Sequence, residues 1–260
     1  MSFTASGSES FEAPGTADLW QPLIGHGAFA VTRPMIVFAV AAIVITAVLI
    51  LSTRKLTIVP SKGQFLLEGS YNLVRNTLGR DIIGSKDFRP FLPLLYSLFI
   101  VLLVNNLFGV FPIIQFPTFS RLGFAVAVAA VVYVTYHTVG IRRKGLVGYF
   151  KGIVPSGLPG WLIPIIWPLE FITVMVMQPA TLALRLFGNM FAGHLMLLVF
   201  TFAGEYLLLH SSGPNKVVGV ISFAATILMS FFEILIEFLQ AYLFALLAAL
   251  YISSALSEEH

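Results

Sequence analysis

The last apolar block of the sequence, Val217 to Leu256, constrains the fold more than any other feature. No glycine or proline follows Gly219, so no residue marks a turn, and the block predicts one helix of about 40 residues. At 1.5 Å per residue this helix is about 60 Å long, twice a hydrocarbon core of about 30 Å. A mean tilt of about 20° does not absorb the excess. We therefore expect a helix strongly oblique to the membrane normal, because the alternative, a hairpin, lacks a turn residue.

The block before it, Pro179 to Leu209, is about 45 Å long by the same rule and also exceeds the membrane thickness. Two steeply inclined helices in succession are unusual. They indicate a surface that follows a curved partner, or one that holds two aqueous pockets at different depths.

The remaining apolar runs predict the fold class. Hydrophobic residues make up 58% of the chain and charged residues 10%, against about 25% charged in a soluble domain. The runs are continuous rather than alternating, so they predict helices and not a β-barrel. We predict an all-α membrane protein with five membrane-embedded helices and one interfacial amphipathic helix, the last two helices being long and strongly tilted. The helices are expected at about 35–53, 62–80 (interfacial), 88–111, 119–140, 161–209 with proline breaks near 164–179, and 217–256.

The distribution of cations predicts the orientation. Segment 54–89 and a basic, glycine-rich loop expected at 141–160 together hold 11 of the 15 lysines and arginines. By the positive-inside rule both face the cytoplasm, which places the N-terminus outside and the C-terminus inside. We expect an extracytoplasmic segment, 1–34, followed by a single membrane domain, 35–260. The segment does not resemble a secretory signal, because Arg33 is its only cation. For the helix at 62–80, a soluble loop helix is the alternative.

Arg185 is a charge inside an apolar helix. Such a charge costs about 2.5 to 3.5 kcal/mol on insertion scales and is a functional hypothesis by default. We interpret it as a permanent cation that faces a partner carboxylate, and the alternative is a structural salt bridge with Glu170 or Glu233. At 100° per residue, one helix face carries Arg185 together with the polar or small residues Gln178, Thr181, Asn189 and Ala192.

The final helix carries two acids on one face. Glu233 and Glu237 are one turn apart and share that face with Gln240 and Tyr251. Carboxylates at this spacing repel each other, so either water reaches them or a cation pairs with one. His194 or Arg185 can supply that cation, although His194 is half a turn out of phase with Arg185. A structural hydrogen-bonding role is the alternative for the acids, and a satisfied core position for the histidine.

Histidine and carboxylate side chains can take up and release a proton, whereas arginine keeps its charge. Histidine and carboxylate side chains beside a permanent cation therefore predict a proton pathway in which protons cannot pass directly across the cation. A secondary transporter is the main rival, but we find no internal repeat. An intramembrane hydrolase is a second rival, but the five histidines lack a His-Glu-x-x-His spacing and the chain has no cysteine. Asn105 and Asn106 either bridge helices or line water, and His137 is expected at an interface.

Two segments carry a family resemblance. The run Leu182–Gly193 (LALRLFGNMFAG) and the run Leu239–Phe244 (LQAYLF), with the terminal SEEH, resemble subunit a of F-type ATP synthases. The resemblance covers about residues 60–260. It implies a stator subunit of a proton-transporting complex in the bacterial plasma membrane, outside the catalytic head and without nucleotide chemistry of its own.

The resemblance also implies residue roles. Arg185 matches the arginine that faces the ion-carrying carboxylate of the rotating subunit c ring, and Asn189 and Gln240 match polar positions near it. His194 and Glu233 match a pair that lines the outer half-channel. In some bacterial members the acid and the imidazole occupy the opposite helices, and this swap supports contact between the two sites.

The implied mechanism moves protons through two offset half-channels. Protons enter near His194, Glu233 and Glu237 and bind to the carboxylates of the rotating ring. They leave near Glu170 and Thr181, while Arg185 blocks direct passage of protons between the two half-channels. Glu237 is a further acid that many members lack. The implied partners are the c ring, the subunit b peripheral stalk, other ATP synthase subunits and the lipid bilayer, with no nucleic acid. No cofactor and no metal are expected, and the residues alone leave proton and sodium undistinguished.

Overall fold

The computed structural model describes residues 22–24, 31–54, 57, 60–110, 118–154, 159 and 161–257. Most of the N-terminal segment predicted at 1–34 therefore lies outside the described residues. Within them, two short strands, β1 (Pro22–Ile24) and β2 (Val31–Thr32), pair antiparallel. Five helices are long and apolar enough to cross a membrane, which confirms the predicted all-α membrane protein.

The helical elements follow one another closely along the chain. They are α2 (Arg33–Thr53), α3 (Lys62–Leu73), the π-helix η2 (Val74–Ile83), α4 (Leu92–Val110), the 3₁₀-helix η3 (Thr118–Ser120), α5 (Leu122–Lys151), α6 (Ile163–Ile172), the π-helix η4 (Thr173–Met177), α7 (Gln178–His210) and α8 (Pro214–Leu256).

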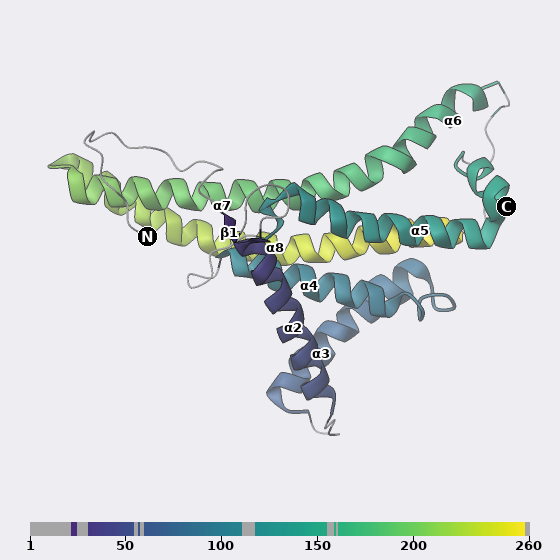
Figure 1. The fold of residues 1–260 in the computed structure, drawn as a ribbon, viewed down its shortest axis with the longest axis horizontal. Coiled ribbons are helices and arrows are strands. Elements are labelled where there is room, and N and C mark those ends of the chain that lie inside the picture. The colour runs from purple at the N-terminus through teal and green to yellow at the C-terminus, as the bar shows by residue number, and fades with distance from the viewer. Residues whose placement is uncertain are drawn as a thin grey trace.

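The two final helices form the long axis of the molecule. Figure 1 shows α7 and α8 side by side and antiparallel along this axis. Their 33 and 43 residues correspond to about 50 Å and 65 Å. The final helix is unbroken, as the absence of turn residues after Gly219 predicts, and no hairpin forms. Both helices are longer than a hydrocarbon core of about 30 Å.

The core lies where α4, α5, α7 and η2 pack against the C-terminal half of α8. Four alanines on α8 are buried there, and their small side chains allow the neighbouring helices to pack closely against α8. Larger side chains from the other helices, such as Phe99 and Leu186, fill the space beside them. The buried alanines are Ala241, Ala245, Ala248 and Ala249.

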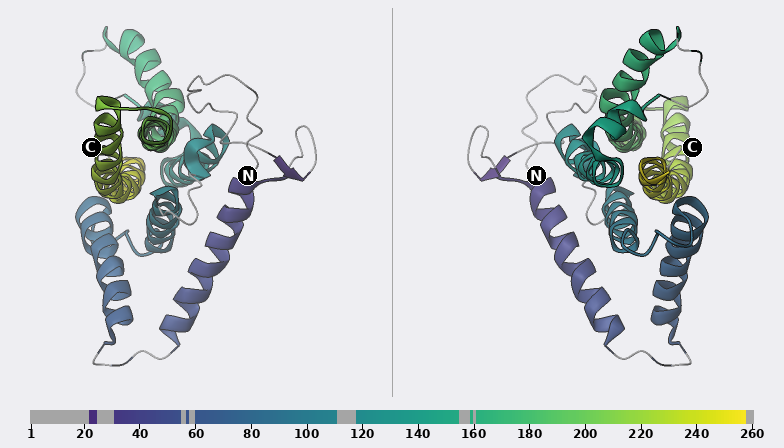
Figure 2. Two further views of the ribbon diagram at one scale, coloured as in Figure 1. Left: turned by 90° about the vertical axis from the view of Figure 1, so that its left-hand side faces the viewer. Right: turned by 90° about the vertical axis from the view of Figure 1, so that its right-hand side faces the viewer.

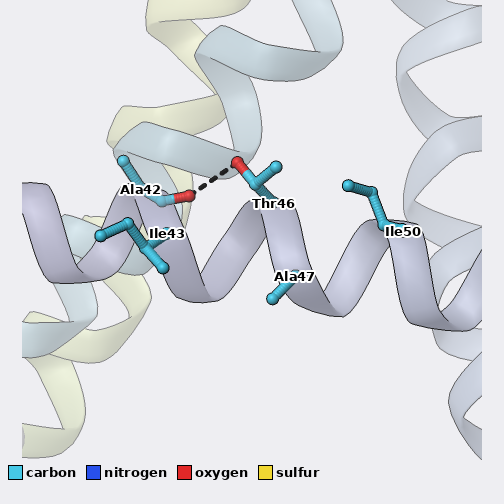
Figure 3. Close-up of a pocket in the computed structure, with 5 residues that line it drawn as sticks. All are labelled: Ala42, Ile43, Thr46, Ala47 and Ile50. Atoms are coloured by element: carbon cyan, nitrogen blue, oxygen red, sulfur yellow. Dashed lines mark hydrogen bonds between the residues drawn. The ribbon is translucent and has the colours of Figure 1, made fainter.

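Helix α2 stands apart from this bundle. Figure 2 shows α2 and α3 on one side of it as the two arms of a V, close together at the ends that lie far from the bundle. Most of α2 is exposed, and its surface holds a shallow apolar groove of about 450 Å³ (Figure 3). The one hydroxyl in the groove, Thr46 Oγ1, donates to the Ala42 carbonyl at 2.7 Å within the same helix. The groove therefore offers little polar chemistry.

The amphipathic segment predicted at 62–80 is helical and runs through α3 and η2. Val74 and Leu78 are fully buried in the core, whereas Phe65 and Leu66 are exposed. The Ser253 hydroxyl on α8 also donates to the Ile82 carbonyl at 2.9 Å. The segment is therefore packed against the bundle, and the choice between an interfacial helix and a soluble loop helix stays a prediction.

The third long helix extends further than the sequence predicts. We expect it to end near residue 140 and a basic loop to follow, yet α5 continues to Lys151 with a break only at Gly145. Gly140 keeps helical geometry, and the ring of Tyr149 packs where its Cβ would lie. The helix breaks at Gly145, whose φ of +70° is a backbone conformation that glycine adopts more readily than other residues.

The prolines before α7 distort the helix without ending it. The π-helix η4 ends two residues before Pro179, whose missing N–H leaves carbonyls of the preceding turn without their usual donor. The Tyr136 hydroxyl on α5 donates to the Val174 carbonyl at 3.0 Å. A side chain from a neighbouring helix therefore supplies one of the missing donors, and the helix runs on.

Candidate functional site

The antiparallel pairing of α7 and α8 brings their polar residues together. Asn189 Nδ2 donates to Gln240 Oε1 at 2.9 Å. Further along the pair, the Ser222 hydroxyl donates to the Phe200 carbonyl at 2.7 Å. These contacts fix the register, so that residues between 189 and 200 on α7 face residues between 222 and 240 on α8.

Glu233 lies within this interval, against a residue without a side chain. A Cβ built on Gly193 would lie 2.6 Å from Glu233 Oε1 and 3.2 Å from its Cδ. The carboxyl group therefore occupies the space that any larger residue at 193 would fill. Gly193 is named from the sequence only as the last residue of the run Leu182–Gly193, and in the structure it is approached by a carboxyl group.

His194 follows Gly193 and points into the bundle. Its side chain is only 4% exposed, and its ring makes a hydrogen bond with the backbone of Gly109 in α4. The other ring nitrogen, Nδ1, has no hydrogen-bond partner among the described residues. Helices α4 and α7 thus meet at this imidazole.

Glu237 lies one turn beyond Glu233 on the same buried face of α8. It is 1% exposed, and its Oε1 has no hydrogen-bond partner within the described part of the chain. Asn106 Nδ2 of α4 donates to the Glu237 carbonyl at 3.4 Å, while Asn106 Oδ1 is left without a partner. Asn106 therefore bridges helices and also presents a bare oxygen. In the sequence, the only signal for this role of Asn106 is the pair of adjacent asparagines in an apolar span.

These residues form one buried polar cluster, which consists of Asn106, His194, Glu233, Glu237 and Gln240. Each has at least one buried polar atom without a hydrogen-bond partner among the described residues, and Glu233 has two. A buried polar group without a partner costs about 1 to 3 kcal/mol. Neither glutamate forms an ion pair with Arg185 or His194 among the described residues, so neither of the two expected cation partners pairs with the acids.

Arg185 lies on the opposite, exposed side of α7. Thr181 and Asn189 are exposed on the same helix, as the 100° rotation per residue predicts. Arg185 forms no hydrogen bond or ion pair with any described residue, so the structural salt bridge to Glu170 or Glu233 does not form. The Thr181 hydroxyl is bound to the Met177 carbonyl of its own helix at 2.7 Å. The guanidinium is therefore available to a group outside this chain.

Glu170 is not part of the buried cluster. It is half-buried in α6 and precedes Arg185 by 15 residues, or about 22 Å along the helical axis. His137 lies in α5, also away from the cluster, and shares a 2.7 Å hydrogen bond with the Tyr149 hydroxyl. Among the described residues, no three histidine or acidic side chains are grouped to hold a metal ion.

Comparison with known proteins gives a consistent result. The family described as ATP synthase A chain matches residues 35–253. An ATP synthase subunit a from Nocardioides sp. is 45% identical over 269 residues, covering 99% of this chain and 97% of its own length. The subunit a of Pseudarthrobacter chlorophenolicus is 41% identical over 98% of this chain and 97% of its own. That of Streptomyces lividans is 37% identical over 96% and 89%.

Proposed function

The chain belongs to the ATP synthase A chain family, and on that premise we propose that it is the stator subunit that passes protons to and from a rotating ring of c subunits. It is a multi-pass bacterial membrane protein that works within the proton-transporting ATP synthase with other subunits of that complex. The proposal assigns the N-terminus to the outside, the C-terminus to the cytoplasm, and a further contact to the subunit b stalk.

The separation between the buried cluster and Arg185 carries this proposal. Arg185 and His194 are nine positions apart on α7, which corresponds to about 14 Å along the helix, and their side chains point to opposite sides. Bare carboxylate, imidazole and amide atoms inside an apolar bundle are suited to hold water and exchange protons. We assign the cluster to the outer half-channel, with His194, Glu233 and Glu237 as its proton-exchanging groups.

Arg185 acts in this scheme as a fixed charge. In lipid its guanidinium would be unpaired, and a ring carboxylate that arrives opposite it removes that cost. Because arginine does not release its proton, water cannot pass protons directly across it. The hydrogen bond between Asn189 and Gln240 lies between Arg185 and His194 and closes the helix pair there. A ring carboxylate protonated at the cluster must therefore leave through lipid rather than past the arginine.

Glu170 and Thr181 are assigned to the inner half-channel. They lie on the N-terminal side of Arg185, in the direction opposite to His194. A proton released there has crossed the membrane potential, which supplies about 2.3 kcal/mol per charge per 100 mV. The translocated ion is assigned as the proton, and no cofactor takes part in this scheme.

Replacement of Arg185 by alanine tests the proposal. In the assembled complex, Arg185→Ala should abolish ATP synthesis driven by a proton gradient and leave ATP hydrolysis by the detached soluble head intact. Lys216→Ala is the matched control, because Lys216 is an exposed cation at the opposite end of the α7–α8 pair, and it should support normal synthesis. Unimpaired synthesis with Arg185→Ala would exclude the gate.

A further inference from the structure

The end of α5 forms a structure that the proton pathway does not use. Helical geometry stops at Gly145, with φ +70° and ψ 167°, and resumes over residues 146–151. Figure 1 shows this last segment leaving the axis of α5 at the right-hand end of the molecule. We call residues 146–151 the hook. Its direction is set by one glycine, because other residues rarely adopt this backbone conformation.

The inner face of the hook is fixed to the bundle. Tyr149 is 7% exposed, and its hydroxyl is hydrogen-bonded to His137 Nδ1 at 2.7 Å. A Cβ at Gly140 would overlap the Tyr149 ring, so this glycine makes room for it. From α6, Trp167 Nε1 donates to the Phe150 carbonyl at 3.2 Å. The hook is therefore held by two helices and presents a defined outer face.

The outer face of the hook is apolar. Val147 is 82% exposed and Leu146 is 61% exposed, and Phe150 lies on the same side at helical spacing. Trp161, at the start of the next helical region, is also exposed. In a soluble protein an exposed group of this kind would favour aggregation. At the end of a membrane bundle it is suited to lie among the first carbons of lipid chains.

Cations surround this apolar face. Arg142, Arg143 and Lys144 precede the hook and Lys151 ends it, and all but Lys144, which is half-buried, are exposed. The sequence has no aspartate or glutamate between Asp87 and Glu170, so no acid close in sequence offsets the charges of Arg142, Lys144 and Lys151. An apolar face bordered by cations matches an anionic headgroup above an acyl chain.

We propose that the hook and the flanking cations Arg142, Lys144 and Lys151 bind the phosphate headgroups of anionic phospholipids in the leaflet that this end of the bundle faces. Leu146, Val147 and Phe150 then insert at the headgroup boundary. Each lysine or arginine near an anionic surface contributes about 1 kcal/mol, which corresponds to about a fivefold preference for the anionic lipid. The site goes beyond the proposed proton pathway and does not depend on it.

Lipid quenching in the intact complex tests this site. The chain has no cysteine, so Val147→Cys introduces one thiol for a fluorescent label. The labelled complex is reconstituted in phosphatidylcholine vesicles that contain an equal fraction of brominated phosphatidylglycerol or brominated phosphatidylcholine. We expect stronger quenching by brominated phosphatidylglycerol. Val134→Cys is the matched control, because Val134 is exposed in the middle of the same helix away from the cations, and there both lipids should quench equally.

Removal of the charges completes the test. Arg142→Gln, Lys144→Gln and Lys151→Gln should each lower the preference for phosphatidylglycerol by roughly fivefold at most, and together they should remove it. Proton pumping by these variants should stay normal and report correct assembly. Equal quenching by the two lipids at position 147 would overturn the proposal. Absence of quenching by either lipid would also overturn it, because a protein subunit would then cover the hook.

Discussion

Replacement of Gly193 by alanine separates helix stability from proton flux. In a helix, alanine is favoured over glycine by about 1 kcal/mol, so the substitution should not weaken α7. The new Cβ would, however, lie 2.6 Å from Glu233 Oε1, where an ordinary contact is at least 3.4 Å. The carboxyl group must therefore move by about 1 Å or rotate away, which is easy because it is the far end of a flexible side chain.

The functional cost follows from this displacement. A misplacement of about 1 Å in proton-exchanging groups can lower a rate by about 100-fold. We expect ATP-driven proton pumping into inverted vesicles to fall by roughly 10- to 100-fold with Gly193→Ala, while the melting temperature of the complex stays the same or rises. The shorter acid in Gly193→Ala/Glu233→Asp should recover part of the flux, because it leaves room for the new methyl group.

Gly123→Ala is the control for this experiment. Gly123 is an exposed residue of α5, and a Cβ there meets no atom within 4 Å. Gly123→Ala should pump protons normally. If Gly193→Ala pumped as well as Gly123→Ala, the position of the Glu233 carboxyl over Gly193 would be irrelevant to transport, and the assignment of this site to the proton path would fail.

Three further predictions concern other contacts of the same fold. His194→Ala and Glu233→Ala should each slow proton pumping, and a double-mutant cycle should give a coupling energy above about 0.5 kcal/mol, whereas additive losses would show that the two sites are independent. Gly145→Ala should lower stability by about 1 to 3 kcal/mol, measured as the thermal inactivation of the complex, because its φ of +70° is strained for alanine; an unchanged midpoint would show that the hook can form without glycine. Tyr136→Phe should cost about 1 to 3 kcal/mol in the same assay, because the Val174 carbonyl loses its donor; a neutral effect would mean that water replaces it.

The long final helices could be predicted because helix continuity is a local property. The absence of a breaker after Gly219 is visible in the sequence, and α8 is unbroken through Leu256. The end of α5 could not be predicted in the same way. Gly140 and Gly145 are both glycines in a basic stretch, and only the contact of Tyr149 with Gly140 and the backbone angle at Gly145 distinguish them.

The buried cluster was partly visible in the sequence. Charged and amide residues in apolar helices stand out because lipid tolerates them poorly, so His194, Glu233, Glu237 and Gln240 were candidates from the start. Gly109 was not a candidate, because its contribution is a backbone hydrogen bond with His194 that has no sequence signal. The choice between ion pairing and water access for the acids was also left open.

The sequence by itself determined that the chain folds in a lipid bilayer, where its helices lie along the chain and which polar residues they carry. These properties depend on hydrophobicity, periodicity and helix breakers, which act over short stretches of chain. The tertiary structure decided the partners of each polar group. Residue 106 meets residue 237, and residue 193 meets residue 233, only because α4, α7 and α8 pack in one register. That register is set by the summed packing of many side chains far apart in sequence, which no local pattern encodes. It leaves Arg185 exposed on one side of α7 and the imidazole of His194 buried on the other.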